Sequence, residues 1–513
     1  MMRKKSFNIV VEGCCHGELD SIYEAIGKLN KPVDLVLICG DFQALRNEQD
    51  MNCIAMPPKY RKLGDFHKYY TGEKKAPYLT LFIGGNHESS NYLWELFYGG
   101  WAAPNIYYMG AASVVNFNGL KIGGLSGIYN HQHFHWHHLE KLPYNGSSER
   151  SVYHVRKFDT MKLLMLRQGL NVMMSHDWPA RIEHFGDLKK LLRFKKHLAR
   201  DVDTGRLGSP AAGSILQNVR PDYWFSAHLH VRYEALVKHE PHEEIVNETK
   251  NATKLIEEES KNEDEIDLEE LLDETDNDKK NEDEIELEGL LDETANDNEA
   301  NKSNVLHAKE ETFQKEALNS DEIDLSSELS LEPSTDQPVK SEAPNNVNKV
   351  GAPETHFLAL DKCLPGRRFI EHITIEVETR PEKRKRRPST LDDGDSAQVT
   401  EEETGLSYDP EWLAITRAFH KYFKTSSNQT VDELPHVNDI DSLNEHISTE
   451  LQWVNENIVD KDLLTIPNNF KVQTETPAAP TSSWKNQQPP EIRNNQTEDF
   501  CRLLELDNRI YHL

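Results

Sequence analysis

Five short segments rich in metal-binding side chains each follow an apolar run typical of a buried strand. The runs are 7–11, 33–38, 78–83, 171–174 and 223–225, and the segments after them are Cys14-Cys15-His16-Gly17, Gly40-Asp41, Gly85-Asn86-His87-Glu88, Ser175-His176-Asp177 and His228-Leu229-His230. In open α/β sheets, side chains at the carboxyl ends of neighbouring strands converge on one crevice. Because His, Asp, Asn and Cys suit one or two divalent transition metals, this pattern predicts metal-assisted hydrolysis.

Apolar runs alternate with amphipathic stretches through the first 240 residues, which predicts a layered α/β domain. Helices are expected at 19–29, 92–97, 152–166 and 188–198, and further strands at 120–124 and 235–237. Two later strand-like runs, 355–360 and 369–378, are expected to complete the same sheet, followed by a helix at 410–422. The intervening stretch is therefore an insertion within one domain.

The charge of the chain is unevenly distributed. Residues 1–239 carry 30 Lys and Arg against 22 Asp and Glu, a balance of +8, whereas residues 240–345 carry 9 against 36, a balance of −27. Residues 241–350 contain two near-identical copies, KNEDEIDLEELLDETDND at 261–278 and KNEDEIELEGLLDETAND at 280–297. Such a composition predicts disorder. The repeats either bind a protein partner as short acidic helices or record a duplication in an unconstrained linker.

We expect four parts: a catalytic region over 1–240, the acidic insertion over 241–350, the rest of the catalytic domain over 351–425, and a mostly flexible tail over 426–513 with short helices near 442–457 and 496–507. The basic hexamer 383–388, KRKRRP, favours nuclear import, although nucleic-acid binding and a solvated tract are alternatives. Six scattered cysteines favour a reduced compartment. No run approaches the ~20 apolar residues of a bilayer span, so no membrane partner is expected.

The chemistry of phosphate-ester hydrolysis suggests a role for each side chain. Asp41, at a sharp turn after a strand, is the candidate bridge between two metals. Asn86 offers an amide oxygen and His176, His228 and His230 offer imidazoles. The two-residue spacing of an extended segment would direct His228 and His230 to one side, and likewise Cys14 and His16, with Cys15 facing away. His87 suits proton donation to a leaving group, and Glu88 and Asp177 could fix the tautomer of an imidazole.

Taken in order, these motifs resemble the calcineurin-like metallophosphoesterase superfamily and, within it, the RNA lariat debranching enzymes. The segments that carry the likeness are GCCHGELD (13–20), CGDFQALRN (39–47), GGNHES (84–89), LSGIY (125–129), SHDWP (175–179), SAHLH (226–230), LALDKCLPGRRF (358–369) and YDPEWLAITRAFH (408–420). The likeness covers about residues 6–240 and 353–423.

The resemblance implies a four-layer αββα sandwich that hydrolyses the 2′–5′ phosphodiester at the branch point of excised introns, with branched intron RNA as substrate. It implies one metal pocket formed by Cys14, His16, Asp41 and His230. It implies a second formed by Asp41, Asn86, His176 and His228, with His87 as proton donor. Position 14, usually Asp in the wider superfamily, is Cys here. Because a thiolate is a softer ligand, zinc or ferrous iron is favoured over magnesium, with manganese also a candidate and one or two ions expected.

The stretch from about 129 to 156 is the candidate substrate-recognition loop. It contains Tyr129, His131, His133, Phe134, Trp136, Tyr144 and Arg150. Aromatic and imidazole rings can stack on unpaired bases, and cations can meet phosphates. The alternative is that these histidines are solvated or form an adventitious metal site.

Two other functions compete with branched-RNA hydrolysis. A general metallophosphoesterase would act on phosphoproteins or small nucleotides and would cleave branched and linear oligonucleotides at comparable rates. A non-catalytic scaffold of the same fold would have lost ligands, whereas every candidate position is filled here.

Overall fold

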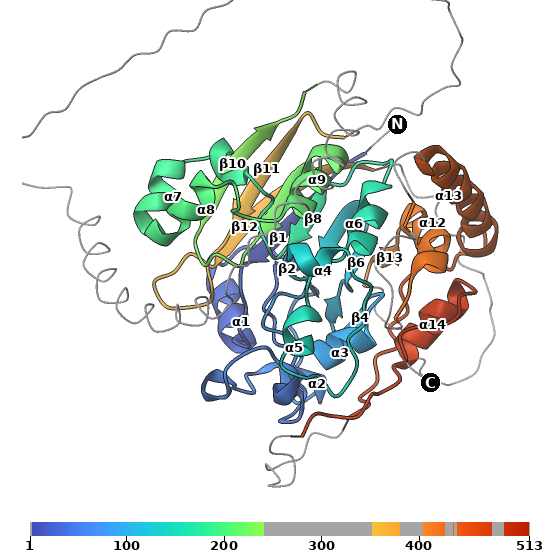
Figure 1. Cartoon of the computed structure of the whole chain (residues 1–513), viewed down its shortest axis with the longest axis horizontal. Helices are drawn as coiled ribbons and strands as arrows, with labels where there is room; N and C mark the ends of the chain where they lie inside the picture. The colour runs from blue at the N-terminus through green and yellow to red at the C-terminus, as the bar shows by residue number, and fades with distance from the viewer. Residues whose placement is uncertain are drawn as a thin grey trace, which may run out of the picture. The chain divides into compact units, whose positions relative to one another are not determined.

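In the computed structural model, residues 3–240, 351–379, 404–425, 434–435, 439–474 and 487–511 are described. Figure 1 shows these elements coloured along the chain. The acidic repeats and the basic hexamer 383–388 lie outside the described residues. In this described part, no helix combines the length and the apolar character needed to cross a bilayer.

Two mixed sheets form the centre of the fold. The first contains, in spatial order, β12 (Ile370–Thr379), β1 (Arg3–Glu12), β2 (Leu35–Ile38), β3 (Thr80–Phe82), β5 (Ile106–Tyr108) and β4 (Gly100–Ala103). The second contains β10 (Tyr233–Lys238), β11 (Glu354–Ala359), β9 (Tyr223–Ser226), β8 (Val172–Ser175), β7 (Leu120–Leu125), β6 (Ala112–Phe117) and β13 (Leu406–Tyr408). Strands β1, β2, β3 and β5 are parallel, as are β7, β8, β9 and β11.

The segment after the acidic insertion adds a strand to each of the two sheets, whereas both runs were expected to complete one and the same sheet. Strand β12 pairs antiparallel with the whole of β1, from Arg3↔Thr379 to Glu12↔Ile370. Strand β11 enters the second sheet between β9 and β10. The described residues on both sides of the acidic insertion accordingly form one compact unit.

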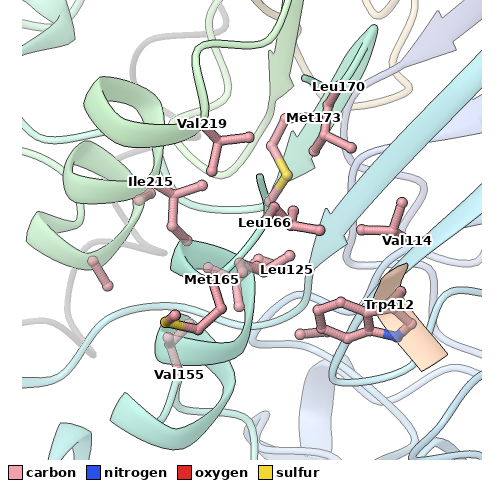
Figure 2. Packing of buried hydrophobic residues seen from close by; sticks show 14 of the residues in the cluster. Val114, Leu125, Val155, Met165, Leu166, Leu170, Met173, Ile215, Val219 and Trp412 are labelled. Carbon is pink, nitrogen blue, oxygen red and sulfur yellow. The ribbon is translucent and has the colours of Figure 1, made fainter. Parts of the chain in front are cut away.

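Alternating side chains of the central strands fill two cores at once. In β1, Phe7, Ile9 and Val11 join the core between the two sheets, whereas Val10 joins the core outside the first sheet. In β8, Met173 instead faces the helices outside the second sheet, where it packs near Leu170, Ile215 and Val219 (Figure 2). Burial on both faces explains why these strands read as continuous apolar runs.

Helices cover the outer face of each sheet, so the predicted four-layer αββα sandwich is confirmed. The first sheet is covered by α1 (Leu19–Lys28), α2 (Phe66–Tyr70) and α3 (Ser90–Glu95). The second is covered mainly by α6 (Lys157–Leu164), α9 (Pro210–Val219), α12 (Pro410–Phe419), α13 (Ile440–Val454) and α14 (Asn495–Leu503). Shorter helices are α4 (His131–Phe134), α5 (Ser148–Ser151), α7 (Leu188–Phe194) and α8 (Ala199–Asp203).

Two predicted helices are interrupted in the structure. The helix expected over 152–166 begins only at Lys157, because Arg156 is extended and its buried guanidinium donates to Glu140 at 2.7 Å. The helix expected over 188–198 breaks at Lys195, after which a 3-10 turn spans Lys196–Leu198. Strands β4, β5, β6 and β13 were not predicted.

The described parts of the C-terminal tail also differ from the expected flexible segment. The two short helices expected there are α13 and α14, and both contribute buried side chains to the core outside the second sheet: Leu443, Ile447, Val454, Phe500 and Cys501. Gln496 binds both backbone polar groups of Trp101 on β4, at 2.7 and 2.8 Å. These described parts of the tail therefore belong to the folded unit.

The tail also holds the candidate recognition loop. The side-chain amide of Gln488 accepts a hydrogen bond from the Tyr144 amide at 2.5 Å and donates one to the Tyr144 carbonyl at 2.9 Å. The neighbouring Gln487 uses only its backbone carbonyl, which accepts from Asn52 at 2.9 Å, while its side chain is exposed. One side chain thus fixes the backbone at the centre of the loop.

We predict that Gln488→Ala loosens residues 130–150. Two hydrogen bonds are lost, each contributing about 1 kcal/mol, so local opening should become roughly 5- to 30-fold more frequent. Limited proteolysis and hydrogen exchange at the Tyr144 amide would measure this. Gln487→Ala is the matched control. Equal protection in the two variants would contradict the role of Gln488.

Candidate metal centre

The predicted ligands converge at the carboxyl ends of strands from both sheets. Four donor atoms, from Cys14, His16, Asp41 and His230, lie within 4.8 Å of one another. The two imidazole Nε2 atoms of His16 and His230 are 3.2 Å apart. These residues follow β1, β2 and β9 in the chain, as the strand-end argument predicts.

A second group of donors meets the first at Asp41. Nε2 of His176 lies 3.2 Å from Oδ1 of Asn86 and 3.4 Å from Oδ1 of Asp41, while Oδ2 of Asp41 lies 3.7 Å from Nε2 of His16. The ring centroid of His228 is 5.1 Å from that of His176. The two oxygens of Asp41 therefore face different groups of donors, as expected of a bridging ligand.

The ligand-bearing turns depend on unusual backbone conformations. His16, Asp41, His228 and His230 all have positive φ, between 45° and 64°. The segment 228–230 is thus not extended, and the predicted strand-like alternation is not how His228 and His230 reach the centre. Non-glycine residues in the left-handed region are uncommon and concentrate at functional sites. Cys15 does face away from the centre, packing in the core outside the first sheet.

Charge and burial match a cation site. Burial alone would raise the pKa of Asp41, but His176, His87 and His16 hold it well below its ordinary value, so the carboxylate is charged. Burial lowers the pKa of His16 to about 4 and that of His228 to about 3, so both imidazoles are neutral and have a nitrogen lone pair to offer. Burial and the charge of Asp41 raise the pKa of the Cys14 thiol. A bound cation would offset that cost, so the donor set fits a divalent transition metal.

Backbone carbonyls orient two of the imidazoles, a feature that the sequence analysis missed. The Cys39 carbonyl lies 2.7 Å from Nδ1 of His176, and the Ala55 carbonyl lies 3.2 Å from Nδ1 of His87. Because a carbonyl only accepts, Nδ1 carries the hydrogen in both rings and Nε2 is free for chemistry. The backbone N–H of His87 donates to Oδ1 of Asp41 at 2.8 Å, which places this residue directly beside the centre.

Glu88 and Asp177 were expected to contact an imidazole, but both bind backbone N–H groups instead. Glu88 accepts from the backbone N–H groups of Phe42, Gln43 and Gly85 at 2.7–2.9 Å, and so ties the Asp41 turn to the Asn86 turn. Asp177 accepts from the backbone N–H of Tyr129 at 3.3 Å and so anchors the start of the candidate loop. The backbone carbonyls of Cys39 and Ala55 contact the rings of His176 and His87 instead.

The candidate recognition residues divide by exposure. His131 and Arg150 are exposed, and so is Trp136, at 40%. Tyr129 and His133 are half-buried, with Nδ1 of His133 2.6 Å from Nδ1 of His154. The prediction is wrong for Phe134 and Tyr144, because exposures of 2% and 7% leave no ring face for a base. These rings pack into the interior of the protein instead.

Glycines allow the close approach of the ligands. A Cβ on Gly85 would lie 2.3 Å from Oδ1 of Asp41 and 2.7 Å from Nε2 of His176. A Cβ on Gly40 would lie 2.3 Å from Nδ1 of His176. Neither position leaves space for a side chain.

We predict that Gly85→Ala lowers metal content several-fold, because the added methyl displaces Asp41 and His176. Elemental analysis of the purified protein would measure it. Gly27→Ala is the matched control, since a Cβ at that helical position meets nothing within 4 Å. Full metal occupancy in Gly85→Ala would contradict the inference that a side chain at this position displaces Asp41 and His176.

Two family models match this chain. The model for calcineurin-like phosphoesterases matches residues 7–232, and that for the C-terminal domain of lariat debranching enzymes matches residues 352–509. The chain is 38% identical over 501 residues to the lariat debranching enzyme of Schizosaccharomyces pombe, covering 97% of this chain and 96% of that protein.

Two vertebrate relatives are longer than the region they share with this chain. Identity to the Danio rerio lariat debranching enzyme is 44% over 506 residues, covering 97% of this chain and 66% of that protein. Identity to the Homo sapiens enzyme is 52% over 252 residues, covering 48% of this chain and 46% of that protein. Because the fission yeast protein is matched over nearly its whole length, the chain belongs to the lariat debranching enzyme family, within the calcineurin-like phosphoesterases.

Proposed function

We propose that this chain hydrolyses the 2′–5′ phosphodiester at the branch point of intron lariats and releases linear RNA. The observation that carries the proposal is the buried Asp41, shared by two groups of donors and placed next to His87. Family membership gives the reaction class, and the donors, all present and in contact range, argue against a scaffold that has lost its ligands.

Two sets of side chains would hold the metal ions. Cys14, His16, Asp41 and His230 form one set. Asp41, Asn86, His176 and His228 form the other. Divalent ions there would polarise the scissile phosphate and lower the pKa of water. The sulfur of Cys14 favours zinc or ferrous iron, with manganese a third candidate, and elemental analysis would distinguish them.

His87 is the residue that we assign to the leaving group. Its Nδ1–H is held by the Ala55 carbonyl, so Nε2 is the atom that takes up and gives away a proton. Transfer of a proton from Nε2 to the departing 2′ oxygen avoids expulsion of a strongly basic alkoxide. The contact of its backbone with Asp41 keeps the residue in register with the ligands.

Branch recognition is assigned to the exposed part of the loop over 129–156. Trp136 supplies an aromatic face for an unpaired base, and Arg150 supplies a cation for a phosphate. Asp177 holds the start of the loop at Tyr129, and Gln488 holds its centre at Tyr144.

The test is cleavage of a synthetic 2′–5′ branched RNA compared with a linear 3′–5′ RNA of the same composition. We expect the metal-loaded protein to cleave the branched substrate at least ~100-fold faster, since ~3 kcal/mol of differential transition-state binding is enough. Comparable rates on the two RNAs would favour a general metallophosphoesterase.

We predict that His87→Ala lowers turnover by about 10²- to 10⁴-fold while metal content persists. His176→Ala should lower both, because it removes a ligand. The exposed His356 provides the control, as His356→Ala should change neither quantity. Loss of metal in His87→Ala would contradict its assignment as a proton donor.

We also propose a nuclear location, on the basis of the basic hexamer 383–388. A fluorescent fusion should leave the nucleus when the five Lys and Arg residues of the hexamer are replaced by Gln. Unchanged nuclear fluorescence would refute this.

A further inference from the structure

A strongly cationic surface lies outside the metal centre, on α7 and the turn that follows it. Residues 188–200 contain six Lys and Arg residues and no Asp or Glu: Lys189, Lys190, Arg193, Lys195, Lys196 and Arg200. All but Lys195 are exposed. Within the described part of the chain, no carboxylate forms an ion pair with the five exposed side chains. Glu183, Asp187, Asp201 and Asp203 flank the stretch without pairing with these side chains, so the cations between them can attract a polyanion.

Exposed aromatic rings lie among these cations. Phe194 is 52% exposed and Phe185 is 44% exposed. The Arg193 guanidinium lies 5.7 Å from the ring centroid of Phe194. A single exposed phenyl ring is ordinary on a protein surface, but rings interspersed with unpaired cations are the combination that binds single-stranded RNA through bases and phosphates. We call the five exposed cations with Phe185 and Phe194 the basic face.

The basic face rests on a fixed support. Asp187 caps α7 by accepting from the Lys190 backbone N–H at 3.0 Å, and Leu191 and Leu198 are buried in the core. Gly186 forms a bridge with Ala235 of β10. Figure 1 shows α7 and α8 next to β10, on the side of the drawing away from α12, α13 and α14. Because this surface is already ordered, binding to it does not carry the entropy cost of ordering the backbone.

The cationic stretch adjoins the chain segment that carries His230. Gly186, two residues before α7, forms a backbone bridge with Ala235 of β10, and β10 begins at Tyr233, three residues after His230. The candidate loop meets the centre elsewhere: its Tyr153 and His154 line a cavity of about 60 Å³ together with Gly84 and Gly85, beside Asn86. Two different surfaces thus approach the ligands from different turns.

We propose that the basic face is a second RNA-binding surface, which holds one single-stranded arm of the branched RNA as it leaves the centre past His230. This inference rests on the proposed function. Three strands meet at a branch, so a loop that grips the branch leaves its arms without contacts. The recognition is electrostatic and stacking in nature and is therefore independent of sequence.

The test compares branched RNAs whose three arms are either one or about ten nucleotides long. The variant is Lys189→Gln with Lys190→Gln, Arg193→Gln and Lys196→Gln in the full-length, metal-loaded protein. Because all four side chains are exposed, circular dichroism and Tm should stay those of the wild type. The matched control replaces four exposed lysines elsewhere, Lys28, Lys31, Lys421 and Lys461, by Gln and changes the net charge equally.

We expect the ratio of KM for the long-armed substrate to KM for the short-armed one to rise at least about tenfold in the quadruple variant and to stay at the wild-type value in the control. The effect should fall on KM rather than kcat. The slope of log KM against log salt for long arms should fall by up to about 2.8, at ~0.7 for each lost phosphate contact.

An unchanged KM ratio and salt slope in a folded quadruple variant would overturn the inference. If wild-type protein cleaves no branched RNA, the proposed function itself fails, which is a separate outcome. The chain's own acidic insertion is the competing occupant. In that case neutralising the four cations would lower KM for long arms, as deletion of 245–345 would, and the inference would again be overturned.

Discussion

The carboxylate of Asp41 is buried among imidazoles, with one oxygen 3.4 Å from His176 and the other 3.7 Å from His16. A charged group without solvent must be compensated locally, and here two groups of donors share the task. The left-handed backbone at His16, Asp41, His228 and His230 and the bare Cα atoms of Gly40 and Gly85 follow from this crowding. Glu88 then ties two of the turns together through three backbone amides.

Much of this arrangement could be predicted because the ends of buried strands can be identified from the sequence. Runs such as 35–38 and 172–175 are buried on both faces, so their limits show as abrupt changes from apolar to polar residues. Parallel pairing then aligns the carboxyl ends of the strands within each sheet, and the packing of the two sheets brings Asp41, after β2, together with His176, after β8. The resemblance to a known family added the division into two pockets and the nature of the substrate.

Other features could not be predicted, for separate physical reasons. Strand β4, Gly-Trp-Ala-Ala, has neither alternation nor β-branched residues. Phe134 and Tyr144 have the composition of a stacking surface, yet burial decided their role, and burial is a property of the whole fold. The tail is ordered by apolar residues at helical spacing, such as Leu443 and Ile447, whose signal is diluted by the Asn- and Gln-rich stretches around them.

The candidate recognition loop and the basic face differ in the way each is built. The loop is held by side chains that bind backbone, among them Asp177 and Gln488, and by the buried pair of Arg156 and Glu140. Most of the basic face lies on the capped helix α7, whose inner side is packed in the core. A surface of the first kind suits discrimination of one geometry, whereas one of the second kind suits repeated, undemanding contacts along a strand.

The acidic insertion leaves the fold from β10 and returns at β11, two strands that pair directly with each other, Lys238 opposite Glu354. The His239 amide also donates to the Pro353 carbonyl at 2.9 Å, so the two ends of the insertion are already fastened together. Because the strand ends are paired, lengthening the loop that joins them costs only about 0.6 kcal/mol for each doubling of its length. Sequence can therefore be gained, duplicated or lost between β10 and β11 during evolution without a change in the catalytic centre.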